Sequence, residues 1–201
     1  KAETVVVRLS RSLENSSNHQ LKDGDVIYGE LHNEVVEFVE HDVKFSAHVI
    51  KGHKTGYFLD HRANRKQVGE WSKNKTVLDV FSYAGGFSVH ALYNGAKEVT
   101  SLDISKQALE VAIQNGKLND YLGLHKTIAG DAFEALKLLI KENKTFDVVV
   151  IDPPSFAKQA SEIDLAKKKY AQLAQLGEQL TAKKGLLVLA SCSSRVVPKA
   201  F

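Results

Sequence analysis

Two short segments hold the residue types best suited to chemistry. One is Asp152-Pro-Pro-Ser-Phe156, which directly follows the apolar run 146–151, and the other is Ser191-Cys-Ser193, which follows another apolar run. Consecutive prolines fix an extended backbone and exclude a helix, so they hold Asp152 at a strand end. A thiol at such a place can act as a nucleophile. Cys192, the single cysteine, could equally be core packing, as a lone cysteine in an apolar run usually is.

Three earlier apolar runs also end in small or acidic residues. Run 76–80 leads into Phe81-Ser-Tyr-Ala-Gly-Gly-Phe87, a turn that lets the backbone approach a ligand closely. The next run ends at Asp103, where a carboxylate can accept both hydroxyl groups of a ribose. The third is followed by Gly130-Asp-Ala132, which suits the edge of an adenine. Each feature has a plainer interpretation, either a strand–helix turn without a ligand or a helix N-cap, for which Ser105 competes with Asp103.

The spacing of these segments predicts the elements that position them. Apolar runs alternate with segments of helical period. The runs are 76–80, 98–103, 125–129, 146–152 and 185–190, and the helical segments are 105–118, 132–141 and 166–180. Such alternation predicts a Rossmann-like, doubly wound α/β fold with a mainly parallel sheet, and ligands bind beyond the carboxyl ends of its strands. We therefore expect the five polar strand ends, Asp152 and Cys192 among them, at one edge of this sheet.

The first fifty residues predict a different kind of domain. Short β-branched runs at 4–9 and 25–28 are separated by turn residues, and runs 35–39 and 43–49 flank Glu40-His-Asp42 as a hairpin would. We therefore expect two domains, a small β-rich domain over 1–53 and a ligand-binding domain over 54–201.

Composition narrows the classes of protein. With 43% hydrophobic and 25% charged residues, the chain has the composition of a globular protein with a core. No apolar run approaches the roughly 18 residues of a membrane span. One cysteine excludes an internal disulfide framework and favours the cytoplasm. The eight histidines show no metal-ligand spacing, so no metal site is predicted. A net charge of +3 permits a polyanionic partner without requiring one.

Four segments in one collinear order resemble a known family. They are Lys54-Thr-Gly-Tyr-Phe-Leu-Asp-His-Arg62, Phe81–Phe87, Asp152–Phe156 and Ser191–Ser193. They are similar to the bacterial 23S rRNA cytosine-5 methyltransferases of the large-subunit methyltransferase I type, which are class I S-adenosylmethionine-dependent enzymes. The resemblance implies S-adenosylmethionine as cofactor and RNA, in particular rRNA, as partner, and it allows a homodimer. That family also carries an N-terminal RNA-binding PUA domain and two further strands, so we expect this chain to be truncated.

The resemblance also implies roles for individual residues. Cofactor-binding residues would be Phe58, Asp60, Arg62, Phe81, Ser82, Gly85, Asp103, Asp131, Ala132 and Asp152. Cys192 would be the nucleophile that adds to C6 of cytosine, and Asp152 would bind the amino group or N3 of the base. Substrate-binding residues would be Pro153, Pro154, Phe156 and Lys158. Tyr83 or Phe156 could stack on the base, and Lys167, Lys168 and Lys169 could follow phosphates, although such residues are often core or a solvated helix face.

Two other functions fit the same residues. The Asp-Pro-Pro-x-Phe segment also suits methylation of a base nitrogen such as guanine N7, which needs no thiol. A Rossmann-like nucleotide-binding domain without methyltransferase activity, such as a dehydrogenase, is the second alternative. Residues 81–87 lack the Gly-x-Gly-x-x-Gly pattern, which argues against a dehydrogenase.

Overall fold

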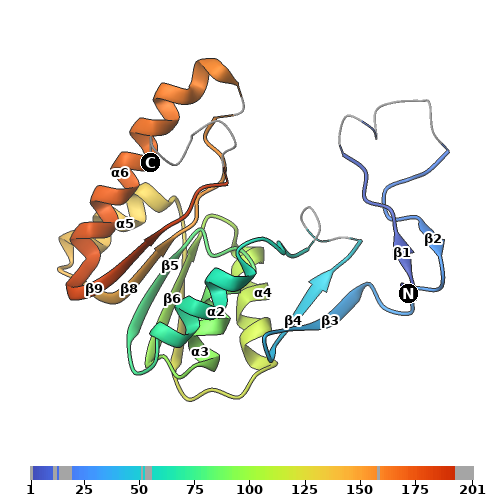
Figure 1. Cartoon of the computed structure of the whole chain (residues 1–201), viewed down its shortest axis with the longest axis horizontal. Helices are drawn as coiled ribbons and strands as arrows, with labels where there is room; N and C mark the ends of the chain where they lie inside the picture. Colours follow the sequence, from blue (N-terminus) through green and yellow to red (C-terminus); the bar gives the residue numbers. More distant parts are fainter. Residues whose placement is uncertain are drawn as a thin grey trace. The chain divides into compact units, whose positions relative to one another are not determined.

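The computed structural model describes residues 2–10, 13, 20–50, 52, 56–157 and 159–192 of the chain (Figure 1). The backbone contacts divide the chain into two compact units, Lys1–Arg62 and Ala63–Phe201. No helix within the described ranges is both long enough and apolar enough to cross a membrane.

A five-stranded parallel sheet forms the centre of the second unit, in the order β7-β6-β5-β8-β9. Its strands are β5 (Thr76–Val80), β6 (Glu98–Asp103), β7 (Leu124–Ala129), β8 (Phe146–Ile151) and β9 (Thr181–Leu189). The strand order reverses on either side of the central β5, and such a switch point opens a ligand-binding crevice in doubly wound folds. The predicted Rossmann-like sheet is therefore confirmed.

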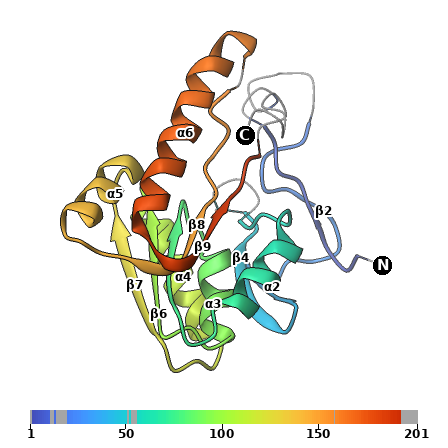
Figure 2. The same cartoon turned by 60° about the vertical axis from the view of Figure 1, so that its left-hand side comes forward.

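Helices cover both faces of this sheet, as Figures 1 and 2 show. They are α2 (Arg62–Trp71), α3 (Gly86–Tyr93), α4 (Lys106–Lys117), α5 (Ala132–Lys141) and α6 (Ile163–Leu180), and a 3-10 turn (Ala160–Glu162) precedes α6. Apolar residues of α5 and α6 pack on one face with Leu78 and Val80, and those of α2 and α3 pack on the other face with Val77. Two separate apolar layers therefore fix β5 in the middle of the core.

Most element boundaries lie within one to three residues of the sequence pattern, with one larger difference at β9. Strand β9 begins at Thr181, directly after α6, where the pattern predicted a strand only from residue 185. Its first residues, Thr181-Ala-Lys-Lys184, have no apolar run to announce a strand, and the pairing with β8 is irregular there. Helix α2 was not predicted either, because only Arg65, Val68 and Gly69 are buried in an otherwise polar segment.

The first unit contains two small antiparallel sheets. Strand β1 (Val5–Val6) pairs with β2 (Val26–Tyr28), and β3 (Val35–Glu40) pairs with β4 (Val43–His48) in full register. His41 and Asp42 between β3 and β4 both have positive φ, 49° and 69°, as the commonest two-residue hairpin turn requires. The predicted hairpin is therefore confirmed, and its alternate residues Val43, Phe45 and Ala47 are buried.

Candidate functional site

The polar segments that follow the strands lie at one edge of the sheet, because the five strands are parallel. Four of these segments begin with a backbone N–H that donates to the neighbouring strand. The bonds run from Ser82 N–H to the Leu102 carbonyl (3.1 Å), Gly130 N–H to Asp103 (3.0 Å), Asp152 N–H to Val80 (3.3 Å) and Ala190 N–H to Ile151 (2.9 Å). The sheet therefore brings together the segments after all five strands, as the sequence predicts.

The turn between β5 and α3, residues 81–86, has an unusual backbone and is called the glycine turn below. Phe81, Tyr83 and Gly85 have φ values of 64°, 48° and 79°. Left-handed conformations are uncommon for residues other than glycine and occur often at functional sites. A Cβ atom on Gly85 would lie 2.7 Å from the Ala112 Cβ, so helix α4 leaves room only for glycine. The amide of the buried Asn115 donates to the Ala84 carbonyl (3.0 Å) and ties the turn to α4.

Ser82 places a buried hydroxyl group in the glycine turn. The residue is only 6% exposed, and its hydroxyl oxygen has no hydrogen-bond partner among the described residues. Buried hydroxyl groups are normally paired, because an unpaired one loses its hydration without compensation. A polar ligand atom above the turn could supply the missing partner.

Asp103, at the end of β6, holds two backbone groups. One carboxylate oxygen accepts the Tyr83 N–H (2.9 Å), and the other accepts the Ser105 N–H (2.9 Å). The N-cap of α4 is Ser105, whose hydroxyl accepts the Ala108 N–H (3.2 Å). Each Asp103 oxygen keeps a second lone pair, so the carboxylate can still accept ligand hydroxyl groups.

Asp131 is the N-cap of α5. Its carboxylate accepts the Glu134 N–H (3.1 Å), and its side chain is exposed, whereas Ala132 in the first turn is buried. The helix-capping interpretation of this residue is therefore correct. Contact of Asp131 and Ala132 with an adenine remains a prediction.

The segment after β8, residues 152–156, is called the Asp-Pro-Pro loop below. Asp152 is half-buried, Pro153 is buried and Pro154 is exposed. Phe156 packs edge-on against Tyr170 of α6, with ring centroids 5.0 Å apart, and Lys169 Nζ lies 5.1 Å from the centroid of the Phe156 ring. These contacts anchor the loop on α6 and favour a packing role for Phe156. Lys158 lies outside the described residues.

Cys192 follows β9, which pairs with β8 as the sequence analysis expects. The thiol is exposed among the described residues, which argues against the core-packing interpretation. Its Sγ donates a hydrogen bond to the Pro153 carbonyl (3.7 Å). The only cysteine of the chain therefore lies against the Asp-Pro-Pro loop. Ser193, on its far side, lies outside the described residues.

Asp79 is a functional candidate that the sequence analysis missed. It is 1% exposed in the middle of β5, and one oxygen accepts both the N–H (2.9 Å) and the hydroxyl (2.6 Å) of Ser88. Burial raises the pKa of Asp79 to about 7, although Ser88 opposes the rise, and the charges of Asp152 and Asp103 raise it further. Asp79 is therefore sensitive to the negative charges of Asp103 and Asp152, which lie at the ends of the two neighbouring strands. An acid inside the run Val77–Val80 was the available signal.

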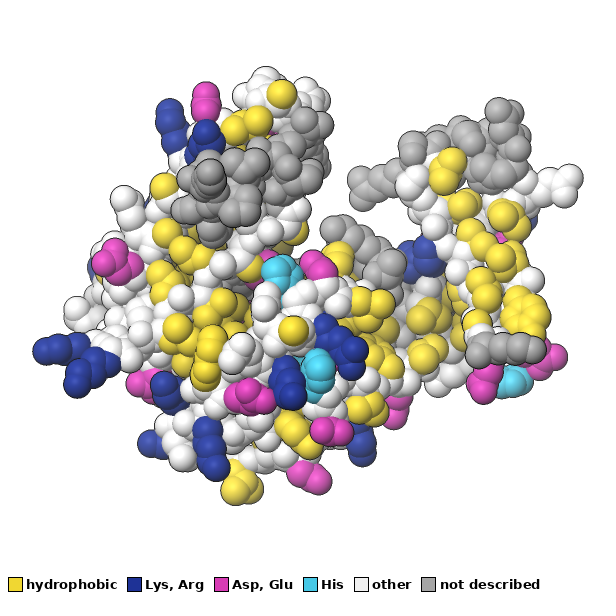
Figure 3. Space-filling view, viewed as in Figure 1, with side chains coloured by type: hydrophobic (Ala, Val, Ile, Leu, Met, Phe, Trp, Pro, Cys, Tyr) yellow, Lys and Arg dark blue, Asp and Glu magenta, His cyan; other side chains and the backbone are white. Residues whose placement is uncertain are grey.

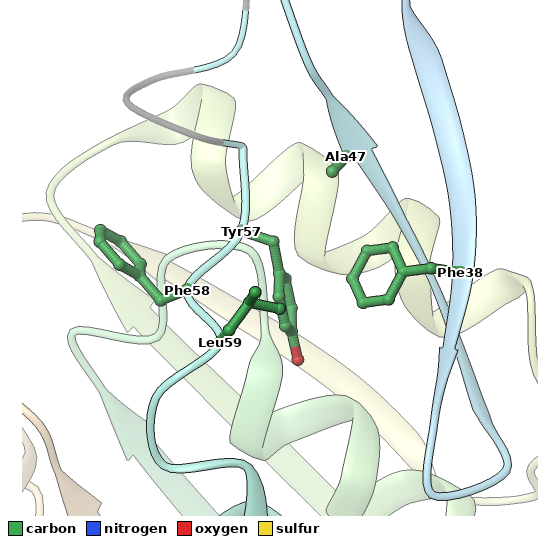
Figure 4. A pocket seen from close by; sticks show the side chains of 5 residues that line it. All are labelled: Phe38, Ala47, Tyr57, Phe58 and Leu59. Carbon is green, nitrogen blue, oxygen red and sulfur yellow. The ribbon is translucent and has the colours of Figure 1, made fainter. Parts of the chain in front are cut away.

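Phe58, Asp60 and Arg62 belong to the first unit. Phe58 lines an apolar pocket of about 370 Å³ with Tyr57, as Figure 4 shows, and its ring points away from that of Phe38. Arg62 is exposed at the start of α2, and the exposed Asp60 lies 3.8 Å from a nitrogen of His61. Binding of a cofactor by these three residues remains a prediction.

The charged side chains on one face of the molecule are of mixed sign (Figure 3). On the face of the described residues that Figure 3 shows, lysine and arginine side chains are interspersed with acidic ones. Within the part of the chain that the structure describes, no three His, Cys, Asp or Glu side chains gather as metal ligands would.

Comparison with known proteins identifies the family. Residues 19–198 match the model of the S-adenosylmethionine-dependent methyltransferases. The chain is 45% identical over 199 residues to a ribosomal RNA large subunit methyltransferase of Deinococcus radiodurans, covering 98% of this chain and 49% of the relative. It is 40% identical over 178 residues to the ribosomal RNA large subunit methyltransferase I of Aeromonas salmonicida, covering 88% and 45%. The chain thus spans about half the length of the curated relatives it matches.

Solved structures lead to the same family. A SAM-dependent methyltransferase from Streptococcus mutans superimposes with a TM-score of 0.77 at 27% identity, covering 88% of this chain and 46% of that chain. A methyltransferase in complex with S-adenosylhomocysteine gives a TM-score of 0.76 at 28% identity, covering 87% and 46%. With its switch point, its glycine turn and these relatives, the chain belongs to the S-adenosylmethionine-dependent methyltransferase family.

Proposed function

We propose that the protein methylates large-subunit ribosomal RNA and forms 5-methylcytosine with Cys192 as the nucleophile. The observation that carries this proposal is the contact between the Cys192 thiol and the Pro153 carbonyl. It supports a site in which an exposed thiol and Asp152 act on the same base. The relatives named as large-subunit ribosomal RNA methyltransferases support the choice of substrate.

The cofactor would bind at the glycine turn. S-adenosylmethionine, when bound, supplies a methyl group from a sulfonium centre. The unpaired Ser82 hydroxyl and the second lone pairs of the Asp103 carboxylate are suited to its polar groups, the latter to the ribose hydroxyls. The negative charges of Asp103 and Asp152, at the ends of neighbouring strands, would suit a cofactor with a positively charged sulfonium. The residues present therefore fit the cofactor of the family.

Cytosine requires covalent help because its C5 is a weak nucleophile. Addition of the Cys192 thiolate to C6 would form a C–S bond, move the displaced electron pair to N3 and make C5 enamine-like. C5 could then take the methyl group, with S-adenosylhomocysteine as the leaving group. A base then removes the C5 proton, the C5–C6 double bond re-forms and the thiolate leaves. Asp152, which follows the neighbouring strand, would accept a hydrogen bond from the exocyclic amino group and hold the ring against the thiol.

Trapping of the covalent adduct tests this proposal. The protein is incubated with S-adenosylmethionine and a large-subunit rRNA transcript that contains 5-fluorocytidine. Fluorine at C5 leaves no proton to remove, so the bond between Cys192 and C6 should persist and be detected as a protein–RNA adduct by denaturing electrophoresis and mass spectrometry. Cys192→Ala should form no adduct and should lose at least about a thousandfold in methyl transfer, as expected for loss of a nucleophile.

The controls separate the alternatives. Cys192→Ala should keep its affinity for S-adenosylhomocysteine, measured by calorimetry, because Cys192 lies outside the glycine turn. Methyl transfer by Cys192→Ala at the wild-type rate would contradict the cytosine-5 chemistry and favour methylation of a base nitrogen. Binding of NAD in place of S-adenosylhomocysteine would contradict the whole proposal.

A further inference from the structure

Four buried or partly buried polar side chains are joined in series beneath the glycine turn. Three hydrogen bonds connect them: Asp79 Oδ2 to Ser88 Oγ (2.6 Å), Ser88 Oγ to Ser101 Oγ (2.6 Å) and Ser101 Oγ to His125 Nε2 (2.8 Å). We call these residues the polar chain. It crosses β5, α3, β6 and β7, and Asp79 and Ser101 are register partners in adjacent strands. The edge strand β7 is thereby connected to the central strand that carries the turn.

The Asp79 end of the polar chain acts directly on α3. The N-cap of this helix is Gly85, which has no side chain to accept a hydrogen bond. The Asp79 carboxylate instead accepts the N–H of Ser88 in the first helical turn (2.9 Å). A carboxylate at this position satisfies a free N–H group and interacts favourably with the helix dipole. Asp79 therefore replaces the missing cap and fixes the helix to which the glycine turn leads.

All three hydrogen bonds of the polar chain have the same order of donor and acceptor, from His125 toward Asp79. The Ser88 hydroxyl donates its single hydrogen to Asp79 Oδ2, so its oxygen can only accept from the next residue. The Ser88 oxygen then accepts from the Ser101 hydroxyl, and Ser101 accepts from a nitrogen of His125. That nitrogen is Nε2, which must carry the proton. The other nitrogen, Nδ1, is buried without a partner among the described residues, as suits a nitrogen without a proton.

We propose that the polar chain is a positioning device, in which neutral His125 in its Nε2–H form keeps the Asp79 carboxylate bound to the first turn of α3. His125 is then a positioning residue for the glycine turn, although it lies two strands away from that turn. Burial also lowers the pKa of His125, which agrees with the neutral ring. The link to cofactor binding rests on the proposed function, but the hydrogen-bond arrangement does not.

The first experiment determines the tautomer. Long-range ¹H–¹⁵N spectra of histidine-labelled protein at pH 8 distinguish the nitrogen that carries the proton, and His125→Gln identifies the His125 signals. The expected result is a neutral ring with its proton on Nε2 only. Ser101→Ala removes the acceptor and should give a mixture of both tautomers. A wild-type ring with its proton on Nδ1, a charged ring, or an unchanged tautomer in Ser101→Ala would overturn the proposal.

The second experiment measures the effect on α3 with two matched variants. His125→Leu removes the N–H donor, and amide hydrogen exchange at Ser88 should become about tenfold faster. His125→Gln retains an N–H donor and should stay within about twofold of the wild type. Ser72→Ala removes another buried hydroxyl, bonded to the Val68 carbonyl (2.7 Å) outside the polar chain, and should leave Ser88 unchanged.

Equal exchange rates in His125→Leu and His125→Gln, or equal acceleration in Ser72→Ala, would show that the chain does not position the helix and would overturn the proposal. Neither experiment uses cofactor or RNA. Their failure would leave the proposed methyl transfer standing, and a failure to trap the RNA adduct would leave the polar chain standing.

Discussion

The glycine turn and the Asp-Pro-Pro loop lie at the same edge of the sheet but are held in different ways. The glycine turn is fixed by buried or partly buried polar contacts, in which Asp103, Asn115 and Asp79 bind its backbone or that of the helix after it. The Asp-Pro-Pro loop is anchored by the ring of Phe156, and the thiol beside it makes one long hydrogen bond and is exposed. The fold therefore preorganises the turn more strongly than the thiol. This agrees with the proposed function, in which a small cofactor would bind at the turn and a large RNA substrate at the loop.

The largest effect is expected from a substitution that disturbs the backbone of the glycine turn. Gly85→Ala places a methyl group 2.7 Å from the Ala112 Cβ at a φ of 79°. Overpacking and left-handed strain should together lower the free energy of unfolding by on the order of 3 kcal/mol. Affinity for S-adenosylhomocysteine should also fall by at least about tenfold, because the turn must shift. Urea unfolding and calorimetry measure the two effects.

Gly130→Ala is the matched control, because a Cβ there would meet no atom within 4 Å. Its unfolding free energy should change by less than about 0.5 kcal/mol. Equal stability of the two alanine variants would show that the turn is not held as rigidly as the comparison requires.

The second-largest expected effect is a pH dependence of the unfolding free energy. It comes from Asp79, which holds the helix after the glycine turn, and has no counterpart in the Asp-Pro-Pro loop. The pKa of Asp79 is raised by burial from 3.8 to about 7, so the folded protein binds more protons than the unfolded chain between these values. Stability from this group is complete below pH 3.8 and is lost as the pH rises to about 7. Between pH 5 and pH 8 the loss should be on the order of 2 kcal/mol.

Asp79→Asn keeps the hydrogen-bond acceptor for Ser88 but cannot ionise. Its unfolding free energy, measured with urea at both pH values, should lack this loss and should gain on the wild type as the pH rises. A difference between variant and wild type that is the same at pH 5 and pH 8 would rule out the ionisation of a buried Asp79.

A smaller effect is expected at the exposed cap of α5. Asp131→Ala removes the acceptor of the Glu134 N–H and should lower the unfolding free energy by about 1 kcal/mol. Asp131→Asn retains an acceptor oxygen and should stay close to the wild type. Thermal unfolding of the three proteins checks this prediction, and an equal loss in both variants would contradict the capping role.

The smallest effect on stability should come from the thiol. Cys192→Ala removes one exposed group with a single 3.7 Å hydrogen bond, so the unfolding free energy should change by less than about 0.5 kcal/mol. A loss above about 2 kcal/mol in urea unfolding would mean that Cys192 holds the two loops together, and the contrast with the glycine turn would disappear.

Much of the fold could be predicted because local patterns report local structure. The runs at 76–80 and 98–103 are strands with those same bounds, and helix α5 has its predicted bounds, 132–141. The hydrophobic pattern did not predict α2, because few residues of that helix are buried. It also missed the start of β9 at Thr181, because the first part of this strand contains two lysines and no long apolar run. They also could not separate two acids at strand ends, because Asp103 binds the glycine turn whereas Asp131 caps a helix.

The sequence by itself determined the alternation of strands and helices, the small-residue turn after the first strand of the sheet and the polar residues after each strand. Only the tertiary structure decided which side chains meet. Asp79 differs from Asp131 because one faces α3 in the core and the other faces solvent. Cys192 lies beside Pro153 because β9 pairs with β8. Strand order and desolvation depend on contacts between residues far apart in the chain, and local patterns carry no information about them.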